Sequence, residues 1–304
     1  MALLLPEADG LADHVARRLP QAEVIRYGQA ARDRLAEVTF YCLPYMGDAA
    51  SIALIGELPR LAVVQSLSSG VDDVTGALPG GVSLCNGHGL GHEEGTAELA
   101  ITLILGSLRR IPWLAGQQAR RTWSHVRTES LDGQRVLLVG YGAIGAAIER
   151  RLTPFGASVS RVSRTPRDGV AALADLPSLA TGADVLVICI GLHPATRGLV
   201  GGQVLAALPD GALVVNVARG AIVVADALIG ELRTGRLRAA LDVTDIEPLP
   251  ADRPEWALPN VLITPHIGGD TAQFARRAPG FVAEQAARHL AGRPLRNVVR
   301  RAGP

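Results

Sequence analysis

A short apolar strand that runs into a glycine-rich turn and then into a helix limits the possible folds of this chain more than any other segment. Residues 135–139 are apolar after the first, and Gly140, Gly142 and Gly145 follow in the spacing GxGxxG before a predicted helix over 146–152. Gly140 permits a tight turn, Gly142 lets a pyrophosphate approach the backbone, and Gly145 lets helix and strand pack closely. The free N–H groups of the helix N-terminus attract phosphates. This order predicts a dinucleotide-binding turn; the alternative is a purely structural glycine-rich turn.

Short apolar strands alternate with helical segments before and after this turn, which indicates parallel sheets with helices on their faces. The strands predicted in the first part of the chain are 2–5, 38–43, 61–67 and 82–85, with helices at 9–19 and 48–56. The strands predicted in the second part are 135–139, 158–162, 185–190, 212–216, 238–243 and 261–264. The second series matches the strand count of a classical dinucleotide-binding domain.

Three further segments complete the predicted layout. A long helix is expected over 94–113, because Leu99, Leu103 and Leu108 recur near helical spacing. Residues 116–123 are polar and arginine-rich, which is typical of a loop or arm. A last helix over 271–290 is expected to be interrupted at Pro279-Gly280.

The second strand of the dinucleotide-binding series ends without the acid that normally holds the adenosine ribose. Ser163 occupies the expected position of that acid, and Arg164 follows it. A carboxylate repels a 2′-phosphate, whereas serine and arginine accept one. We therefore expect NADP to be preferred. The alternative is that Arg164 only stacks on the adenine, which permits NAD.

The composition excludes several classes of protein. The chain contains 30 basic residues and no lysine, so Schiff-base catalysis and a Walker A phosphate loop are excluded. A net charge of +1 gives no reason to expect nucleic acid or an anionic membrane as a partner. Residues 1–7 lack a basic region before their leucines, so we expect neither a signal peptide nor a membrane span there. Cys42, Cys85 and Cys189 lie apart in apolar stretches, so we expect buried thiols and a cytoplasmic location.

Three later stretches each place a polar residue just past the C-terminal end of a predicted strand, the edge at which doubly wound sheets bind ligands. They are residues 214–220, 240–250 and 259–269. Together with residues 65–72, 131–133 and 196–199, they resemble the D-isomer-specific 2-hydroxyacid dehydrogenase family over nearly the whole chain.

The resemblance implies a role for individual residues. Arg219 would bind the substrate carboxylate and polarise the 2-oxo group, since its planar fork suits a carboxylate. His266 would be the general acid in reduction and the base in oxidation, because an imidazole exchanges a proton near neutral pH. Glu247 would hydrogen-bond His266 and favour the imidazolium. Backbone N–H groups around Ser68, Ser69 and Gly70 would also hold the substrate carboxylate.

The resemblance also implies the cofactor contacts, with Asp242 near the nicotinamide carboxamide. The expected contacts are Gly140, Tyr141, Gly142, Ala143, Ile144, Gly145, Ser163, Arg164, Thr165, Gly191, Thr196, Val217, Ala218, Asp242, His266 and Gly268. Each of the three catalytic candidates has a plainer reading: Arg219 as a surface arginine, Glu247 as a loop carboxylate and His266 as a core histidine. Their combination and order beside the glycine turn favour catalysis.

Two histidines four residues apart form a candidate metal-binding pattern. His88 and His92 flank two glycines and precede two glutamates, a pattern that on a helix suggests a metal site. Because glycines disfavour a helix between them, we expect no metal and interpret the segment as an interdomain loop or a helix N-terminus. For His193 the alternatives are a contact with the cofactor and a plain loop residue, of which we expect the loop residue.

The predicted fold is two α/β domains of the Rossmann type, a doubly wound dinucleotide-binding domain inserted into a flavodoxin-like substrate domain. Residues 1–94 and 269–304 form the substrate domain and 95–268 the cofactor domain. The resemblance implies a homodimer that packs through residues 94–123, with Trp113 and Trp123 as candidate interface aromatics.

The predicted function is NAD(P)-dependent reduction of a small 2-oxo acid, or oxidation of the corresponding 2-hydroxy acid, with glyoxylate or hydroxypyruvate as the first choice. The first alternative is a larger 2-oxo acid or a phosphoglycerate-type substrate, for which Tyr45 and Met46 are candidate pocket residues. An alternative of another class is a non-catalytic dinucleotide sensor that acts as a co-repressor and retains the same fold.

Overall fold

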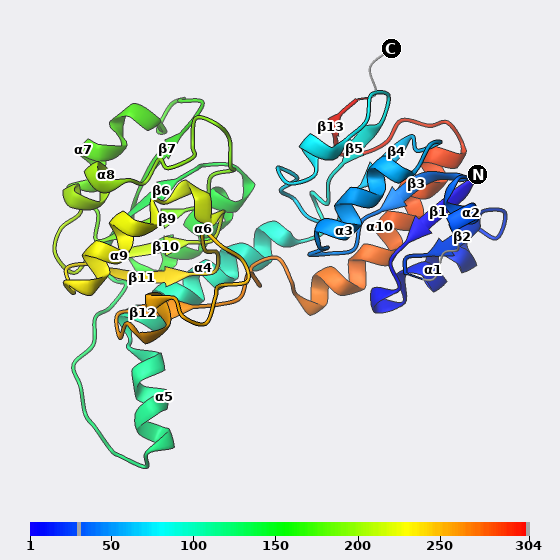
Figure 1. Ribbon diagram of the computed structural model, residues 1–304. Coiled ribbons are helices and arrows are strands. Elements are labelled where there is room, and N and C mark those ends of the chain that lie inside the picture. Colours follow the sequence, from blue (N-terminus) through cyan, green and yellow to red (C-terminus); the bar gives the residue numbers. More distant parts are fainter. Residues whose placement is uncertain (29–31, 302–304) are drawn as a thin grey trace. The chain divides into compact units, whose positions relative to one another are not determined.

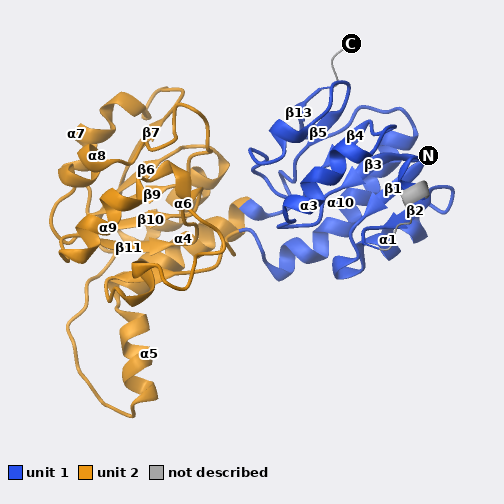
Figure 2. Ribbon diagram, viewed as in Figure 1, with its two compact units in different colours: residues 1–92, 269–304 blue, residues 93–268 orange. Residues whose placement is uncertain are grey.

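The computed structural model describes residues 1–28 and 32–301 and separates the chain into two compact units (Figures 1 and 2). Unit 1 comprises residues 1–92 and 269–304, and unit 2 comprises residues 93–268. The chain therefore passes from unit 1 to unit 2 after His92 and returns after Gly268. The expected boundaries were 94/95 and 268/269.

Unit 1 is built on one six-stranded sheet in the order β13-β5-β4-β3-β1-β2. Its strands are β1 (Ala2–Leu5), β2 (Glu23–Arg26), β3 (Val38–Cys42), β4 (Val63–Gln65), β5 (Ser83–Cys85) and β13 (Val298–Arg300). The first five pair in parallel in the flavodoxin-like order, and β13 adds an antiparallel edge. Alternate residues of β1 enter separate cores, Leu3 and Leu5 on one face and Ala2 and Leu4 on the other.

Unit 2 is built on a seven-stranded sheet in the order β12-β11-β10-β9-β6-β7-β8. Its strands are β6 (Arg135–Val139), β7 (Ser158–Ser163), β8 (Ala171–Ala172), β9 (Val185–Ile188), β10 (Leu213–Asn216), β11 (Arg238–Leu241) and β12 (Val261–Ile263). All the pairings are parallel, so the predicted doubly wound fold class is confirmed. Strand β6 pairs with β7 on one side and β9 on the other. The strand order therefore reverses at β6, which is the topological switch point of the sheet.

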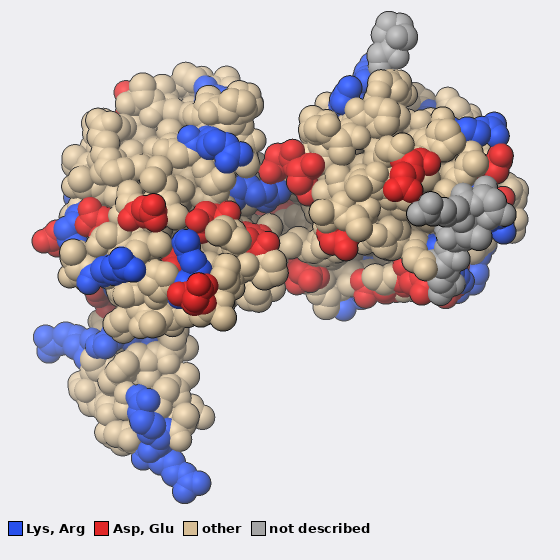
Figure 3. Space-filling model, viewed as in Figure 1, with Lys and Arg blue, Asp and Glu red and all other residues tan. Residues whose placement is uncertain are grey.

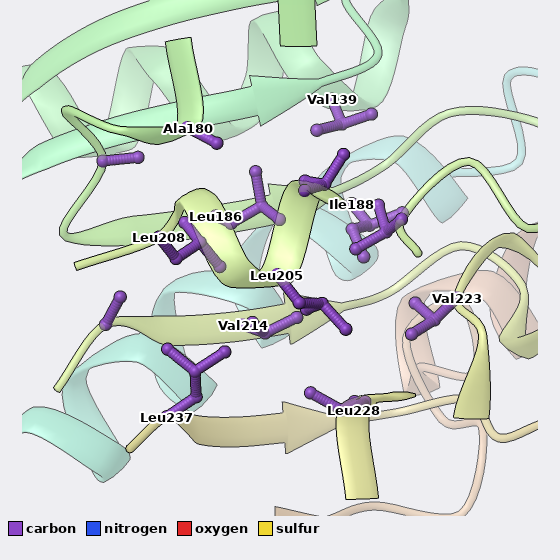
Figure 4. Packing of buried hydrophobic residues seen from close by; sticks show 14 of the residues in the cluster. Val139, Ala180, Leu186, Ile188, Leu205, Leu208, Val214, Val223, Leu228 and Leu237 are labelled. Carbon is purple, nitrogen blue, oxygen red and sulfur yellow. The ribbon is translucent and has the colours of Figure 1, made fainter. Parts of the chain in front are cut away.

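Helices cover both faces of the two sheets. They are α1 (Leu11–Arg18), α2 (Arg32–Leu35), α3 (Ala49–Ala53), α4 (His92–Leu108), α5 (Ile111–Ala119), α6 (Ala143–Leu152), α7 (Leu176–Ala180), α8 (Gly202–Ala207), α9 (Ala225–Arg233) and α10 (Ala272–Leu290). In unit 2, Leu205 of α8 and Leu228 of α9 pack on Leu186, Ile188 and Val214 of the sheet (Figure 4). Such two-sided burial explains why the central strands are continuous apolar runs.

Three short strands were not predicted from the sequence. The strand β2 is polar and lies at a sheet edge, β8 has two residues, and β13 is short and mostly exposed. Edge strands bury little side-chain area, so they carry little apolar periodicity.

The predicted single helix over 94–113 is wrong, because the chain forms two helices. Helix α4 ends at Leu108, and α5 begins at Ile111 after Arg110 adopts a left-handed conformation with φ of 52°. Pro112 lies in the first turn of α5, where a missing N–H costs nothing, but it disfavours continuation of the preceding helix. Part of the arm expected as a loop at 116–123 is therefore helical through Ala119.

The predicted interruption of the last helix at Pro279-Gly280 is also wrong. Helix α10 runs without a break from Ala272 to Leu290, with Pro279 inside it and the Thr271 side chain as its N-cap. Phe274, Val282 and Ala286 of this helix are buried in the unit 1 core. This burial offsets the local cost of the proline and glycine.

No single helix among the described residues is long and apolar enough to span a membrane; α4 and α5 together reach that length and composition, but they are bent by 64° at the break between them.

The packing of unit 2 predicts the cost of a core truncation. Leu186 of β9 is fully buried in the core cluster that includes Leu205 of α8. We expect Leu186→Ala to lower the free energy of unfolding by about 2–5 kcal/mol, because it removes buried methyl groups and leaves a cavity. Urea denaturation followed by circular dichroism measures this change. Val224→Ala, at a side chain that is 42% exposed, is the control. Equal losses for both variants would contradict the assigned core.

Candidate active site

The register of the unit 2 sheet brings five loops to one edge. Val139 pairs with Ile188, Ile188 with Asn216, Asn216 with Leu241, and Leu241 with Ile263. The segments that follow these strands therefore leave the sheet side by side, and they contain the candidate cofactor and catalytic residues. This is the edge at which open parallel sheets bind ligands.

The glycine turn after β6 has the shape that its spacing predicts. Gly140 has a φ of 108°, and a Cβ there would lie 2.6 Å from the backbone of Ile190. A Cβ on Gly145 would lie 2.4 Å from the Gly140 carbonyl oxygen. No described atom lies within 4 Å of a Cβ placed on Gly142, so its backbone is open to a phosphate. The turn leads directly into α6, which begins at Ala143 and includes Ile144. No described side chain caps the N-terminus of this helix, so its amides suit the pyrophosphate of a dinucleotide.

Arginine side chains surround the second residue of the glycine turn. Tyr141 donates a hydrogen bond from its hydroxyl to Glu149, which also pairs with Arg161. The guanidinium of Arg167 lies 5.3 Å from the centre of the Tyr141 ring and donates to the Tyr141 carbonyl oxygen over 2.6 Å. These contacts hold the aromatic ring beside the turn.

The end of β7 presents arginines and no acid at the predicted ribose position. Ser163 is buried, and its hydroxyl donates to the Thr165 carbonyl oxygen over 2.7 Å. Arg164 and Thr165 are exposed. The Ser163 hydroxyl therefore shapes the turn that presents Arg164.

The loop after β9 is held by a buried threonine. The Thr196 hydroxyl accepts from the His193 amide over 2.8 Å and donates to the Gly191 carbonyl oxygen over 2.9 Å. The ring of His193 accepts a hydrogen bond from the Ala195 amide, as expected of a loop residue. Gly191 itself is open, with no described atom within 4 Å of an added Cβ. Thr196 thus shapes the turn, and Gly191 is the more open of these two predicted contacts.

Asn216, at the end of β10, builds the turn that carries Arg219. Its side chain donates to the Arg219 carbonyl oxygen over 3.0 Å and accepts from the Ala218 amide over 3.1 Å. A Cβ on Gly220 would lie 1.9 Å from the Thr244 carbonyl oxygen, so this turn packs backbone to backbone against the loop after β11. The Arg219 guanidinium donates to the Ala218 carbonyl oxygen. Val217, the first residue of the turn, is buried.

Glu247 and His266 form the predicted hydrogen-bonded pair. The Nδ1 atom of His266 lies 2.7 Å from Oε2 of Glu247, and the Thr244 amide donates to the other carboxylate oxygen over 3.1 Å. Burial opposes ionisation of Glu247, but the hydrogen bond and charge of His266, the Thr244 amide and the charge of Arg219 outweigh it, so the pKa of Glu247 is lowered. A charged Glu247 beside one ring nitrogen orients the imidazole and leaves Nε2 for a ligand.

Asp242 holds the backbone on which His266 lies. The Asp242 side chain is buried, and its carboxylate accepts from the Thr264 hydroxyl and from the amides of Ile267 and Gly268, all within 2.9 Å. His266 has a φ of 55°, and its amide donates to the Asp242 carbonyl oxygen. This left-handed conformation is costly for a non-glycine residue and is maintained by the surrounding bonds. The observed contacts of the Asp242 side chain are thus with the loop that follows β12, and its contact with the nicotinamide stays a prediction.

The predicted carboxylate-binding loop lies in unit 1, after β4. The Ser68 amide donates to the Ser66 hydroxyl over 3.1 Å, so it has a partner within its own loop, and its role as a substrate donor stays a prediction. Gly87 and Asn86 bind the carbonyl oxygens of Ser68 and Ser69. The amides of Ser69 and Gly70 have no acceptor among the described residues, and the buried Ser69 hydroxyl oxygen has no partner there. Ser69 and Gly70 therefore remain the candidate donors.

The His88 and His92 pair gives no support to a metal site. His92 is buried, and its ring nitrogens face the carbonyl oxygens of Leu67 and Gly269. Over residues 1–28 and 32–301 no group of three or more metal-ligating side chains is found.

The sequence analysis did not identify the residues that support the loops of the catalytic candidates. Asn216 and Gly220 act through the backbone of the catalytic loops, and Thr264 donates its hydroxyl to the Asp242 carboxylate. A single signal was present for Asn216, a polar residue at the end of an otherwise apolar strand. The close approach at Gly220 joins segments that are distant in the sequence, so no local pattern reveals it.

Comparisons with known proteins agree with this arrangement. Residues 101–268, inside unit 2, match the family model "D-isomer specific 2-hydroxyacid dehydrogenase, NAD binding domain". The chain is 34% identical over 294 residues to a glyoxylate/hydroxypyruvate reductase A of Serratia proteamaculans, covering 91% of this chain and 92% of that protein. It is 32% identical over 257 residues to a D-3-phosphoglycerate dehydrogenase of Methanocaldococcus jannaschii, covering 81% of this chain but 49% of that protein.

A solved structure resembles the fold over almost the full chain. It is a D-isomer specific 2-hydroxyacid dehydrogenase from Xanthobacter autotrophicus in complex with NADPH and MES, with a TM-score of 0.80, 30% identity and coverage of 98% of this chain and 97% of that one. The family model and the full-length relative together identify the chain. It belongs to the D-isomer specific 2-hydroxyacid dehydrogenase family and is an NAD(P)-dependent oxidoreductase that acts on the CH–OH group of its donor.

Proposed function

We propose that this enzyme reduces a small 2-oxo acid, glyoxylate or hydroxypyruvate, with NADPH as the preferred donor. The observation that carries the proposal is the Glu247–His266 hydrogen bond of 2.7 Å at the ligand-binding edge of the unit 2 sheet. A carboxylate-supported imidazole is the group that delivers a proton to a developing alkoxide near neutral pH.

Each catalytic candidate has a task that follows from its position. His266 donates its Nε2 proton to the oxygen of the 2-oxo group as that oxygen gains charge. Glu247 holds the other ring nitrogen and stabilises the imidazolium before transfer. Arg219, presented by the Asn216 turn, binds the substrate carboxylate and polarises the carbonyl. In oxidation the same groups act in the reverse direction.

Unit 2 is proposed as the cofactor-binding unit and unit 1 as the unit that supplies further carboxylate donors. The nicotinamide supplies and accepts the hydride. The open backbone of Gly142 and the free N-terminus of α6 suit its pyrophosphate. In unit 1, the amides of Ser69 and Gly70 are the donors available to a carboxylate.

The choice of substrate rests on relatives. The Serratia protein, which this chain matches over nearly its full length, is named a glyoxylate/hydroxypyruvate reductase. A phosphoglycerate-type substrate is the alternative, supported by the Methanocaldococcus relative, of which this chain spans about half. We also propose a cytoplasmic location, because the three cysteines are free thiols.

The preference for NADPH is argued from the charge at the end of β7. Arg164 is exposed directly after the buried Ser163, and Arg167 reaches back over 2.6 Å to the carbonyl of Tyr141 in the glycine turn. Two guanidinium groups thus lie beside the end of β7, where NAD-dependent enzymes place a carboxylate. A relative with the same fold was solved with NADPH.

We further propose a homodimer that forms through the segment 94–123. Helix α5 projects from unit 2 in Figure 1, and we call residues 111–123 the arm. Trp123, the last residue of the arm, is fully exposed. Ile111 is 54% exposed, and Trp113 lies under the Arg110 guanidinium. The viewed face of the arm carries basic and no acidic side chains (Figure 3). Exposed aromatic and apolar side chains with arginines are the composition of a protein interface.

The first experiment tests the reaction and its acid. Oxidation of NADPH is followed with glyoxylate, hydroxypyruvate, pyruvate and bulkier 2-oxo acids. We expect turnover with the small acids and a loss of about 100-fold or more in kcat for His266→Gln, because proton transfer contributes that much. His193→Gln, at a loop histidine of the same unit, is the matched control and should retain activity. Binding of NADPH without reduction of any acid would instead support a dinucleotide sensor.

The second experiment tests the cofactor preference. We expect kcat/KM with NADPH to exceed that with NADH by more than about tenfold, and Arg164→Ala to reduce this ratio by about tenfold, because a charge-assisted bond to the 2′-phosphate is worth about 1.5–3 kcal/mol. Arg233→Ala, an exposed arginine at the end of α9, is the control. A wild-type preference for NADH would refute the proposal.

The third experiment tests the dimer. Light scattering after gel filtration should give twice the chain mass of 31.8 kDa. The double substitution Ile111→Asp and Trp123→Asp should give the monomer mass, because it puts charge into an apolar contact. Phe155→Ala, at another exposed aromatic of unit 2, should leave the mass unchanged. A monomeric wild type would contradict the proposal.

A further inference from the structure

A buried imidazole joins two distant segments of unit 1. His92, the first residue of α4, is 4% exposed. Its Nε2 atom lies 2.6 Å from the carbonyl oxygen of Leu67, and its Nδ1 atom lies 3.1 Å from the carbonyl oxygen of Gly269. The reaction proposed above gives this residue no task.

The ring is fixed in place by the residues that pack around it. It lies against Phe274 of α10, with ring centres 4.7 Å apart, and it stacks on Tyr45 at 5.7 Å. A Cβ on Gly269 would lie 2.5 Å from Nδ1 of His92, so the backbone there is in close contact with the ring edge. The imidazole therefore cannot turn away from the two carbonyls without displacing its neighbours.

The chemistry of the ring suits this position. Both partners are carbonyl oxygens, which only accept hydrogen bonds, and an imidazole carries nitrogen atoms on two sides of a rigid plane. The neutral ring donates to one carbonyl, and the imidazolium donates to both. An apolar side chain at this position leaves the carbonyl oxygens of the buried Leu67 and the partly buried Gly269 without a donor from residue 92.

Both carbonyls belong to segments beside proposed functional residues. Leu67 directly precedes the loop with Ser69 and Gly70, and Gly269 follows His266 by three residues. A Cβ on Gly87 would lie 2.0 Å from the Leu67 carbonyl oxygen, so that peptide is held from the side of Gly87 as well. The orientation of the Leu67–Ser68 peptide sets the direction of the amides that follow it.

His92 also lies where the chain changes unit. The chain leaves unit 1 after His92 and re-enters it at Gly269, so one ring joins the two points of passage. We propose that His92 is a positioning residue that fixes the carboxylate-binding loop, through Leu67, to the segment that follows His266. This inference rests on the proposed function for the role of the loop, but the tie itself belongs to unit 1.

The test compares substitutions at His92 with one at His289, a partly buried histidine of the same unit. His92→Leu removes both ring nitrogens, and His92→Gln keeps an amide donor. We expect KM for the 2-oxo acid to rise about tenfold or more in His92→Leu and less in His92→Gln, while KM for NADPH stays within about twofold, because the polar contacts of the ring with the loop and the return segment are lost. His289→Gln is the control, since that ring contacts Thr39 over 3.0 Å elsewhere in unit 1.

Hydrogen–deuterium exchange gives a readout that does not depend on activity. Peptides that cover residues 66–70 and 268–271 should exchange faster in His92→Leu than in wild type, and they should be unchanged in His289→Gln. If His92→Leu does not fold, the same comparison is made with His92→Gln.

The outcomes separate this inference from the proposed function. Unchanged exchange in both segments, or an equal rise of both KM values in a folded variant, would overturn the role of His92. Faster exchange in an enzyme whose wild type reduces no 2-oxo acid would leave the tie in place and overturn the proposed function.

Discussion

The in-register parallel pairing of β6, β9, β10, β11 and β12 is the constraint on which the site depends. Because parallel strands all end at one edge, the pairing of Val139, Ile188, Asn216, Leu241 and Ile263 places the segments that follow them side by side. The glycine turn, the arginine turn and the loops of Glu247 and His266 are separated in the sequence, and only the sheet brings them together.

Within this edge, buried polar side chains maintain the loop shapes. The Asp242 carboxylate accepts from the Thr264 hydroxyl before His266 and from the amides of Ile267 and Gly268 after it, and Asn216 closes the turn of Arg219. Both side chains are buried and hydrogen-bonded, so each loop has a defined shape. Such rigid support is what a catalytic pair requires, since small displacements of the reacting groups are costly.

The sequence predicted those features that depend on local patterns. The strand, glycine turn and helix from Arg135 to Leu152, the parallel fold class and the Glu247–His266 bond agree with the structure. The break between α4 and α5 and the continuity of α10 through Pro279 do not. In both cases a local propensity competes with burial, and the strength of burial is not visible in a local window.

The sequence by itself determined which chemical groups are present and at which strand ends they occur: glycines that admit a phosphate, an arginine, a glutamate and a histidine. Tertiary structure alone decided their partners, including the use of the Ser68 amide by Ser66, the contact of Gly220 with Thr244 and the link from His92 to Leu67 and Gly269. The physical reason is the distance along the chain over which each kind of information acts. Spacing along the chain encodes backbone conformation over a few residues, whereas hydrogen bonds and close contacts join segments whose approach depends on the packing of the whole sheet.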